Sequence, residues 1–200
     1  MKTVLLPVHP NWLELILSGK KTVEVRKTKP KEAVPFRVLL YCAKAKPYLV
    51  YGDRFNGQSF ISEHATLRGY SRESAEKIWD IMNGKIVGEF VCNEISKFTV
   101  EFVDGDYYED IRYCYTTTDD EEDKIIISTN EDNNPNKNWL CKESCLSFDN
   151  IKKYIGVNFH EKPFYGWHIS DLKIYDKPKE LSEFGLKRAP QSWCYVEELR

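Results

Sequence analysis

Three charged residues, close together near the start of the chain, carry the side chains best suited to chemistry. Lys21, Glu24 and Arg26 bring an ammonium, a carboxylate and a guanidinium within six residues, just after Gly19. Arginine can bind a phosphate or a carbonyl with two hydrogen bonds. A carboxylate can accept from a nucleobase amino group or act as a general base, and lysine can contact phosphate or serve as base or nucleophile. This charged trio therefore predicts a polar ligand site. The alternative is an exposed lysine followed by a surface Glu–Arg pair, which contributes about 0–1 kcal/mol.

The segments around the charged trio are expected to be a short helix and a strand. Residues 11–18 carry apolar side chains at helical spacing, and Gly19 is a natural residue to end a helix. Residues 22–26 alternate polar and β-branched side chains, as a strand does. Glu24 and Arg26 are two apart, so on a strand they share one face and can point into one cleft.

The rest of the chain predicts an α+β fold, a twisted and partly closed β-barrel flanked by two or three helices. Strands outnumber helices, and most connections are long. No clean linker divides the chain, so we expect one domain over residues 1–200, with a loop and helix insertion at about 44–83 and an acidic insertion at about 104–138. Further strands are expected at 3–8, 36–42 (central in its sheet), 85–102 with a break near 93–96, 164–175 broken at Asp171, and 193–197. Further helices are expected at 71–82 and 147–155, and one edge strand within the acidic insertion.

Composition indicates a globular, cytoplasmic protein that does not enter membranes. Hydrophobic residues make up 42% and aromatic residues 14% of the 200 residues, enough for a packed core. No apolar run approaches the roughly 20 residues that cross a bilayer. The first residues lack the apolar stretch and cleavage site of an export signal.

The net charge of −2 hides an uneven distribution. Residues 20–46 carry nine Lys/Arg against two acids, and residues 104–132 carry eleven Asp/Glu against two bases. The basic segment could follow a phosphate backbone, because counterion release depends on local charge. A solvated lysine-rich loop explains it equally well.

Nothing in the sequence indicates a metal or a cofactor. Six cysteines are scattered through the chain, and without an export signal they are expected to be reduced thiols. Cys141 and Cys145, even with His160 and His168, match no common zinc spacing. No Walker loop, dinucleotide fingerprint or hydrolytic triad is present.

The pattern Gly-x-Lys-x-x-Glu-x-Arg, met by Gly19 and the charged trio, resembles the signature of the ASCH domain, the activating-signal-cointegrator homology domain. Further matches follow in the expected order along the chain. They are the preceding helix at 12–18, the strand at 38–42, and segments 85–90, 165–172 and 188–196, the last similar to the ending of a prophage- and bacterium-associated branch. The resemblance covers about residues 1–48, 84–102 and 160–197.

The resemblance implies a PUA-like β-barrel and a cleft lined by the signature residues. ASCH domains are similar to RNA or nucleotide binders, some small members hydrolyse an acetylated cytidine nucleoside, and others are associated with nuclease activity. Members with the hydrolase activity combine a lysine, a threonine and a glutamate. Lys21 matches the lysine, but Glu24 stands where the threonine is expected, and Thr22 is the nearest hydroxyl.

Aromatic and amide side chains are candidates to complete the cleft. Tyr41 and Trp193 could stack against a base, and Gln191 and Ser192 could hydrogen-bond its edge. Both aromatic residues are equally plausible as core.

Three hypotheses about function follow. The first is binding of RNA or a nucleotide-like ligand by the charged trio with Tyr41, Gln191, Ser192 and Trp193. The second is a hydrolase acting on a modified nucleoside or on RNA, with Lys21 and Glu24 in acid/base roles. The third is a protein-interaction domain whose acidic insertion contacts a basic partner.

Overall fold

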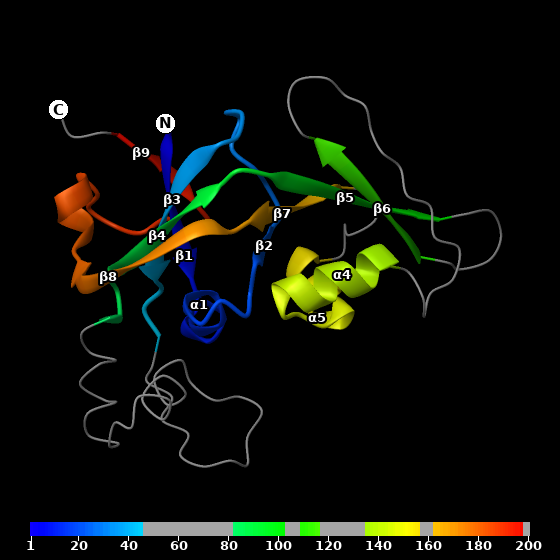
Figure 1. The fold of residues 1–200 in the computed structure, drawn as a ribbon, viewed down its shortest axis with the longest axis horizontal. Coiled ribbons are helices and arrows are strands. Elements are labelled where there is room, and N and C mark those ends of the chain that lie inside the picture. The colour runs from blue at the N-terminus through cyan, green and yellow to red at the C-terminus, as the bar shows by residue number, and fades with distance from the viewer. Residues whose placement is uncertain (46–81, 103–108, 117–134, 157–161, 198–200) are drawn as a thin grey trace, which may run out of the picture. The chain divides into compact units, whose positions relative to one another are not determined.

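The computed structural model describes residues 1–45, 82–102, 109–116, 135–156 and 162–197 (Figure 1). These residues form two compact units. The first comprises Met1–Lys20, Phe36–Val91 and Asp171–Arg200, and the second Lys21–Pro35 and Cys92–Ser170. The expectation of one domain over 1–200 stays a prediction. The helix at 71–82 and most of both insertions fall outside the described residues.

The first unit is built on a five-stranded sheet in the order β8-β4-β3-β1-β9. Strand β3 lies at its centre, as its continuous apolar sequence predicts. β1 and β3 run parallel, with Thr3 opposite Arg37 and Val8 opposite Cys42. β9 pairs antiparallel with β1. The strands are β1 (Thr3–Val8), β3 (Phe36–Cys42), β4 (Ile86–Cys92), β8 (Ser170–Lys179) and β9 (Cys194–Val196).

The described residues of the first unit include helix α1 and the 3₁₀ helix η2. Helix α1 (Pro10–Leu17) buries Leu13, Ile16 and Leu17, the stripe that its sequence spacing predicts. Gly19 follows it at φ +74°, a left-handed conformation that glycine adopts without strain, so the predicted helix stop is confirmed. The 3₁₀ helix η2 (Leu181–Phe184) was not expected from the sequence, and it packs against a core cluster around Leu5 and Leu39.

The described residues of the second unit form a four-stranded antiparallel sheet in the order β2-β7-β5-β6 with two helices against it (Figure 1). Val23, Val25, Phe98 and Phe164 from the strands form one core cluster with Leu140, Phe148 and Ile151 from the helices. The strands are β2 (Val23–Arg26), β5 (Ile95–Phe102), β6 (Glu109–Thr116) and β7 (Phe164–His168), and the helices are α4 (Pro135–Ser144) and α5 (Phe148–Ile155).

Most predicted elements among the described residues are confirmed, and one α-helix was missed besides η2. The break near 93–96 separates β4 from β5. The break expected at Asp171 lies instead at Ile169, between β7 (Phe164–His168) and β8, and Asp171 has a left-handed φ of 49° within β8. Strand β6 is the edge strand expected within the acidic insertion. Helix α4 overlaps the end of that insertion and was not predicted, because its apolar stripe is limited to Trp139, Leu140 and Cys141.

The α+β class is confirmed. Within the described ranges each sheet keeps two edge strands, so neither closes on itself as a barrel. None of the helices described is long and apolar enough to cross a membrane.

Candidate functional site

The charged trio lies together in the second unit and is buried. Glu24 is held between the two cations: its Oε2 lies 3.3 Å from Lys21 Nζ, and its Oε1 lies 2.9 Å from Arg26 Nη2. Lys21 is 2%, Glu24 7% and Arg26 8% exposed. Removing three charges from water costs several kcal/mol per ion, and only close pairing offsets that cost. The prediction of an exposed lysine and a surface pair is therefore excluded for these residues.

Strand β2 explains why Glu24 and Arg26 can meet. They occupy alternate positions on one face of an edge strand, and their cross-strand partners on β7 are Trp167 and Tyr165. Val23 and Val25 on the opposite face fill the core cluster under the helices. The polar and apolar alternation in the sequence thus fixes which side chains form the site.

The C-terminal end of helix α4 supplies acceptors for the residues just before β2. Lys21 Nζ donates to the Ser144 carbonyl oxygen at 2.6 Å. The Thr22 backbone N–H donates to the Glu143 carbonyl, also a last-turn oxygen, at 2.9 Å. The Thr22 hydroxyl donates to the Glu143 carboxylate. Carbonyls at a helix C-terminus have no partner within the helix and carry partial negative charge, so a lysine there is stabilised.

Tyr154 on helix α5 lies beside Arg26 and Glu24. Its side chain is hydrogen-bonded to that of Arg26. Burial raises the pKa of Tyr154, with a further rise from the Glu24 charge, while Arg26 opposes both. The residue is nevertheless 40% exposed, and the Lys27 ammonium lies 5.4 Å from its ring centroid. A ligand approaching Arg26 in this unit would meet an aromatic ring beside the cation.

Sequence reasoning missed Tyr154, Glu143 and Ser144. All three approach the trio from the helices, more than a hundred residues away in the chain. The only signal for α4 was Pro135, a good first residue for a helix. The signal for α5 was clearer. Ser147 is its N-cap, and the Ser147 side chain accepts a hydrogen bond from the Asn150 backbone N–H.

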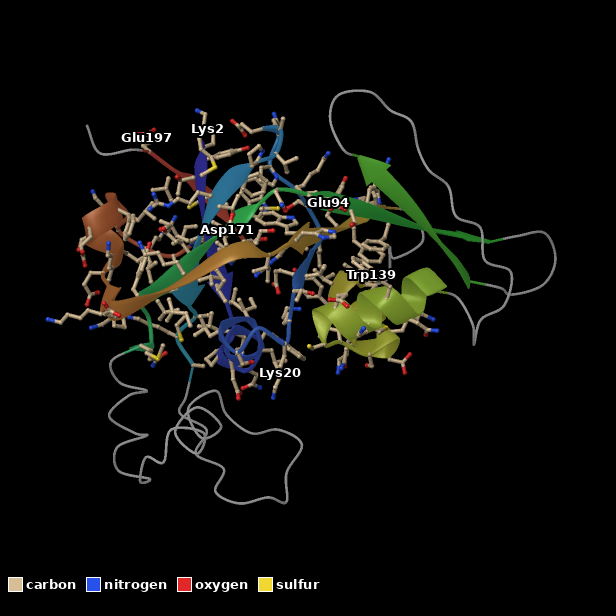
Figure 2. All side chains as sticks on the ribbon, in the orientation of Figure 1. Lys2, Lys20, Glu94, Trp139, Asp171 and Glu197 are labelled. Atoms are coloured by element: carbon tan, nitrogen blue, oxygen red, sulfur yellow. The ribbon has the colours of Figure 1, made fainter. Side chains whose placement is uncertain are left out.

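A second polar cluster surrounds His168 at the end of β7. Its Nε2 lies 2.7 Å from Ser96 Oγ and 3.5 Å from Glu94 Oε1, and the Trp139 ring stacks on the imidazole with centroids 5.5 Å apart. Figure 2 labels Glu94 and Trp139. Ser96 is fully buried, and serine and carboxylate meet the same ring nitrogen. A Ser-His-acid triad uses both ring nitrogens, so this cluster does not have that geometry.

The other predicted ligand contacts belong to the first unit. Tyr41 lies on β3, is 4% exposed and belongs to the core cluster of that unit. Gln191 is exposed, Ser192 and Trp193 are half-buried, and the Trp193 ring packs edge-on against Tyr195 at 5.4 Å. A ligand role for these four residues stays a prediction.

Five of the cysteines are outside any disulfide, and two of these thiols are poorly suited to reaction. Cys42, Cys92, Cys141, Cys145 and Cys194 form no disulfide. Burial raises the pKa of Cys42 to about 11 and that of Cys92 to about 12, so little reactive thiolate exists at neutral pH. Within the described ranges no group of three or more His, Cys, Asp or Glu side chains could hold a metal ion.

Replacing Lys21 is expected to destabilise the protein far more than replacing its neighbour. Lys21→Ala leaves Glu24 with one cation fewer in a buried position, so the free energy of unfolding should fall by about 3–5 kcal/mol. Lys20 is exposed, and Lys20→Ala should change that free energy by no more than about 0.5 kcal/mol. Urea denaturation of both variants measures the difference, and equal losses would contradict the buried position of Lys21.

Stability should depend on pH through His168. Burial is the main cause of a lowered pKa at His168, although Glu94 and Glu143 oppose it. The unfolded chain therefore binds a proton at the His168 imidazole more readily than the folded chain does. The resulting stability is complete above about pH 6.5 and is lost as the pH falls through that value toward the lower folded-state pKa.

The measurement is urea denaturation at a series of pH values from 7.5 to 5.5. The free energy of unfolding should fall with pH, and less steeply in His168→Gln. His9, whose pKa is also lowered by burial, contributes equally to both proteins. Identical slopes would show that His168 does not carry the effect.

Comparison with known proteins gives a family and a fold. Two solved structures, the ASCH protein of Zymomonas mobilis and its tyrosine-to-phenylalanine mutant, each align with a TM-score of 0.51. The first is 14% identical and the alignment covers 98% of this chain and 89% of that one; for the mutant the values are 15%, 99% and 92%. They are PUA-like β-barrel folds, and at this identity the likeness concerns the fold alone. No curated protein matches the sequence. The family model of the ASCH domain matches residues 6–109, more than half of the chain, and the protein therefore belongs to the ASCH domain family.

Proposed function

We propose that this protein binds RNA or a nucleotide-like ligand at the charged trio, with Tyr154 beside Arg26. The ASCH family is PUA-like and is generally linked to RNA binding, which supports this class of ligand. A ligand role for Tyr41, Gln191, Ser192 and Trp193, which belong to the first unit, stays a separate prediction.

The observation that carries the proposal is the buried carboxylate of Glu24 between Lys21 and Arg26. A buried ion network is weak evidence for stability, because well-packed apolar residues of similar volume often stabilise a protein as well or better. Its chemistry is suited to a ligand that carries both negative charge and hydrogen-bonding edges. Arginine binds phosphate or carbonyl oxygens, and a carboxylate accepts from a base amino group. Glu24 also fixes the orientation of Arg26 before any ligand arrives.

The third hypothesis, a protein partner bound through the acidic insertion, stays a prediction. Only β6 and the first residues of α4 represent residues 104–138 in the described part of the chain. The trio supplies no argument for or against it.

Arg26→Ala should weaken binding of short single-stranded RNA by about 10- to 100-fold. Hydrogen bonds to charged groups contribute about 1.5–3 kcal/mol, which corresponds to that range. Fluorescence anisotropy at low salt with a labelled oligonucleotide measures the dissociation constant, and the affinity of the natural sequence should fall as salt rises.

Arg37→Ala is the matched control. Arg37 also pairs with a glutamate, Glu89, at 3.0 Å, but its side chain is 39% exposed and lies in the first unit. Circular dichroism must show that both variants fold. Absence of RNA binding at low salt would remove the RNA form of the proposal, and equal losses in the two variants would remove the site.

A hydrolase acting on a modified nucleoside or on RNA is the second candidate. The observation that favours it is the Thr22 hydroxyl, which donates to the Glu143 carboxylate directly beside Lys21. A hydroxyl in contact with a base is the arrangement that activates a nucleophile. In this candidate Thr22, with Glu143 as the base beside it, supplies the hydroxyl that the expected threonine position lacks, and Lys21 and Glu24 act as acid and base toward the substrate.

The hydrolase candidate predicts turnover that two substitutions abolish for different reasons. Thr22→Val removes the hydroxyl at nearly constant volume, and Lys21→Ala removes the ammonium; each should lower kcat at least about 100-fold. Product formation from acylated nucleosides and from RNA is followed by chromatography, with Lys20→Ala as the active control. Full activity in folded Thr22→Val, or no turnover of any substrate by the natural sequence, would contradict it.

A further inference from the structure

Two exposed lysines that follow the charged trio each lie over a tyrosine of the same unit. The Lys27 ammonium is 5.4 Å from the ring centroid of Tyr154, and that of Lys29 is 5.8 Å from the ring centroid of Tyr165. Both lysines are exposed. The residues come from three places, the chain just after β2, helix α5 and strand β7.

Both tyrosines are neighbours of Arg26. Tyr154 is hydrogen-bonded to the Arg26 side chain, and Tyr165 is the cross-strand partner of Arg26. Directly opposed residues in an antiparallel pair extend to the same face of the sheet. On its other side Tyr165 is opposite Lys97 of β5, so the row Arg26–Tyr165–Lys97 places a ring between two cations.

The two rings are not required by the core of the second unit. The core cluster is formed by Val23, Val25, Phe98 and Phe164 of the strands, with side chains from α4 and α5. Tyr165 follows Phe164 and so extends to the opposite face of β7, where it is half-buried. Tyr154 is one of the exposed large hydrophobic residues in the described part of the chain.

We propose that Lys27 with Tyr154 and Lys29 with Tyr165 are two successive nucleotide subsites on either side of Arg26, so that the ligand is single-stranded RNA rather than a single nucleoside. In each subsite the base stacks on the tyrosine ring and the lysine contacts the adjoining phosphate. This inference rests on the proposed function and specifies its ligand.

A base stacked on either tyrosine ring is expected to contribute more free energy than the lysine that lies over that ring. An ammonium over an exposed tyrosine contributes little, whereas a base on an aromatic ring is a major source of affinity for single strands. The lysine side chain is flexible, so it can leave the ring when a base arrives and follow the phosphate. Stacking does not discriminate strongly between bases, so little sequence preference is expected at these two subsites.

Ligand length separates this arrangement from a nucleoside pocket. A mononucleotide can occupy one Lys–Tyr pair at a time, while an oligonucleotide can occupy both and Arg26 together. The affinity should therefore increase steeply between uridine monophosphate and hexauridylate. In the competing explanation the lysines are solvated and only cover the rings. A longer oligonucleotide would then gain affinity only from the general attraction of its additional phosphates.

The experiment measures dissociation constants of labelled hexauridylate by fluorescence anisotropy at several salt concentrations, with uridine monophosphate as a competitor. Tyr154→Leu and Tyr165→Leu should each weaken hexauridylate binding roughly 5- to 100-fold. Lys27→Gln and Lys29→Gln should each reduce the slope of log affinity against log salt by about 0.7, the value for one phosphate of a single strand.

Lys179→Gln is the matched control. The Lys179 ammonium also lies over a tyrosine ring, Tyr175 at 4.7 Å, but in the first unit. Its salt slope and affinity should match those of the natural sequence. Circular dichroism and urea denaturation check that each variant is folded.

The results distinguish the inference from the function on which it rests. If Arg26→Ala weakens binding as expected while Tyr165→Leu and Lys29→Gln leave hexauridylate binding unchanged, the two-subsite inference is overturned and the proposed site remains. Equal affinity for uridine monophosphate and hexauridylate overturns it as well. No binding of either ligand by the natural sequence overturns both.

Discussion

The site depends on the two ion pairs that the buried carboxylate of Glu24 makes. The carboxylate contacts Lys21 with one oxygen and Arg26 with the other. Without this carboxylate, the charges of Lys21 and Arg26 would be buried with no anion between them. Without Lys21 or Arg26, the buried Glu24 charge would lose one of its two ion pairs. Lys21 in turn contacts the end of α4 through the Ser144 carbonyl. The position of α4 and the position of the Lys21 charge are therefore coupled in the second unit, since a shift of α4 would remove a hydrogen-bond acceptor from Lys21.

Local rules explain how much of this could be read from the sequence. Gly19 ends α1, the alternation from Val23 to Arg26 gives β2, and Ser147 begins α5. Each of these signals acts over a few residues, and each is confirmed. The common face of Glu24 and Arg26 follows from the two-residue period of a strand.

The long-range partners could not be predicted in the same way. Ser144 and Tyr154 reach the trio only because α4 and α5 pack on the sheet through Leu140, Phe148 and Ile151. Sequence spacing contains no information on which residue a helix end will place beside a lysine more than a hundred positions earlier. Tyr41 shows the opposite case. Its aromatic ring made it a candidate for stacking on a base, but it lies in the core of the first unit, where a large aromatic residue is equally suitable.

A nuclear magnetic resonance titration of isotope-labelled protein with single-stranded RNA tests the central claim most directly. If the Glu24-bridged trio binds the ligand, the amides from Lys21 to Arg26 and that of Tyr154 should show the largest chemical-shift changes, and these should saturate together. Saturable changes confined to other residues, with this group unmoved, would contradict the account.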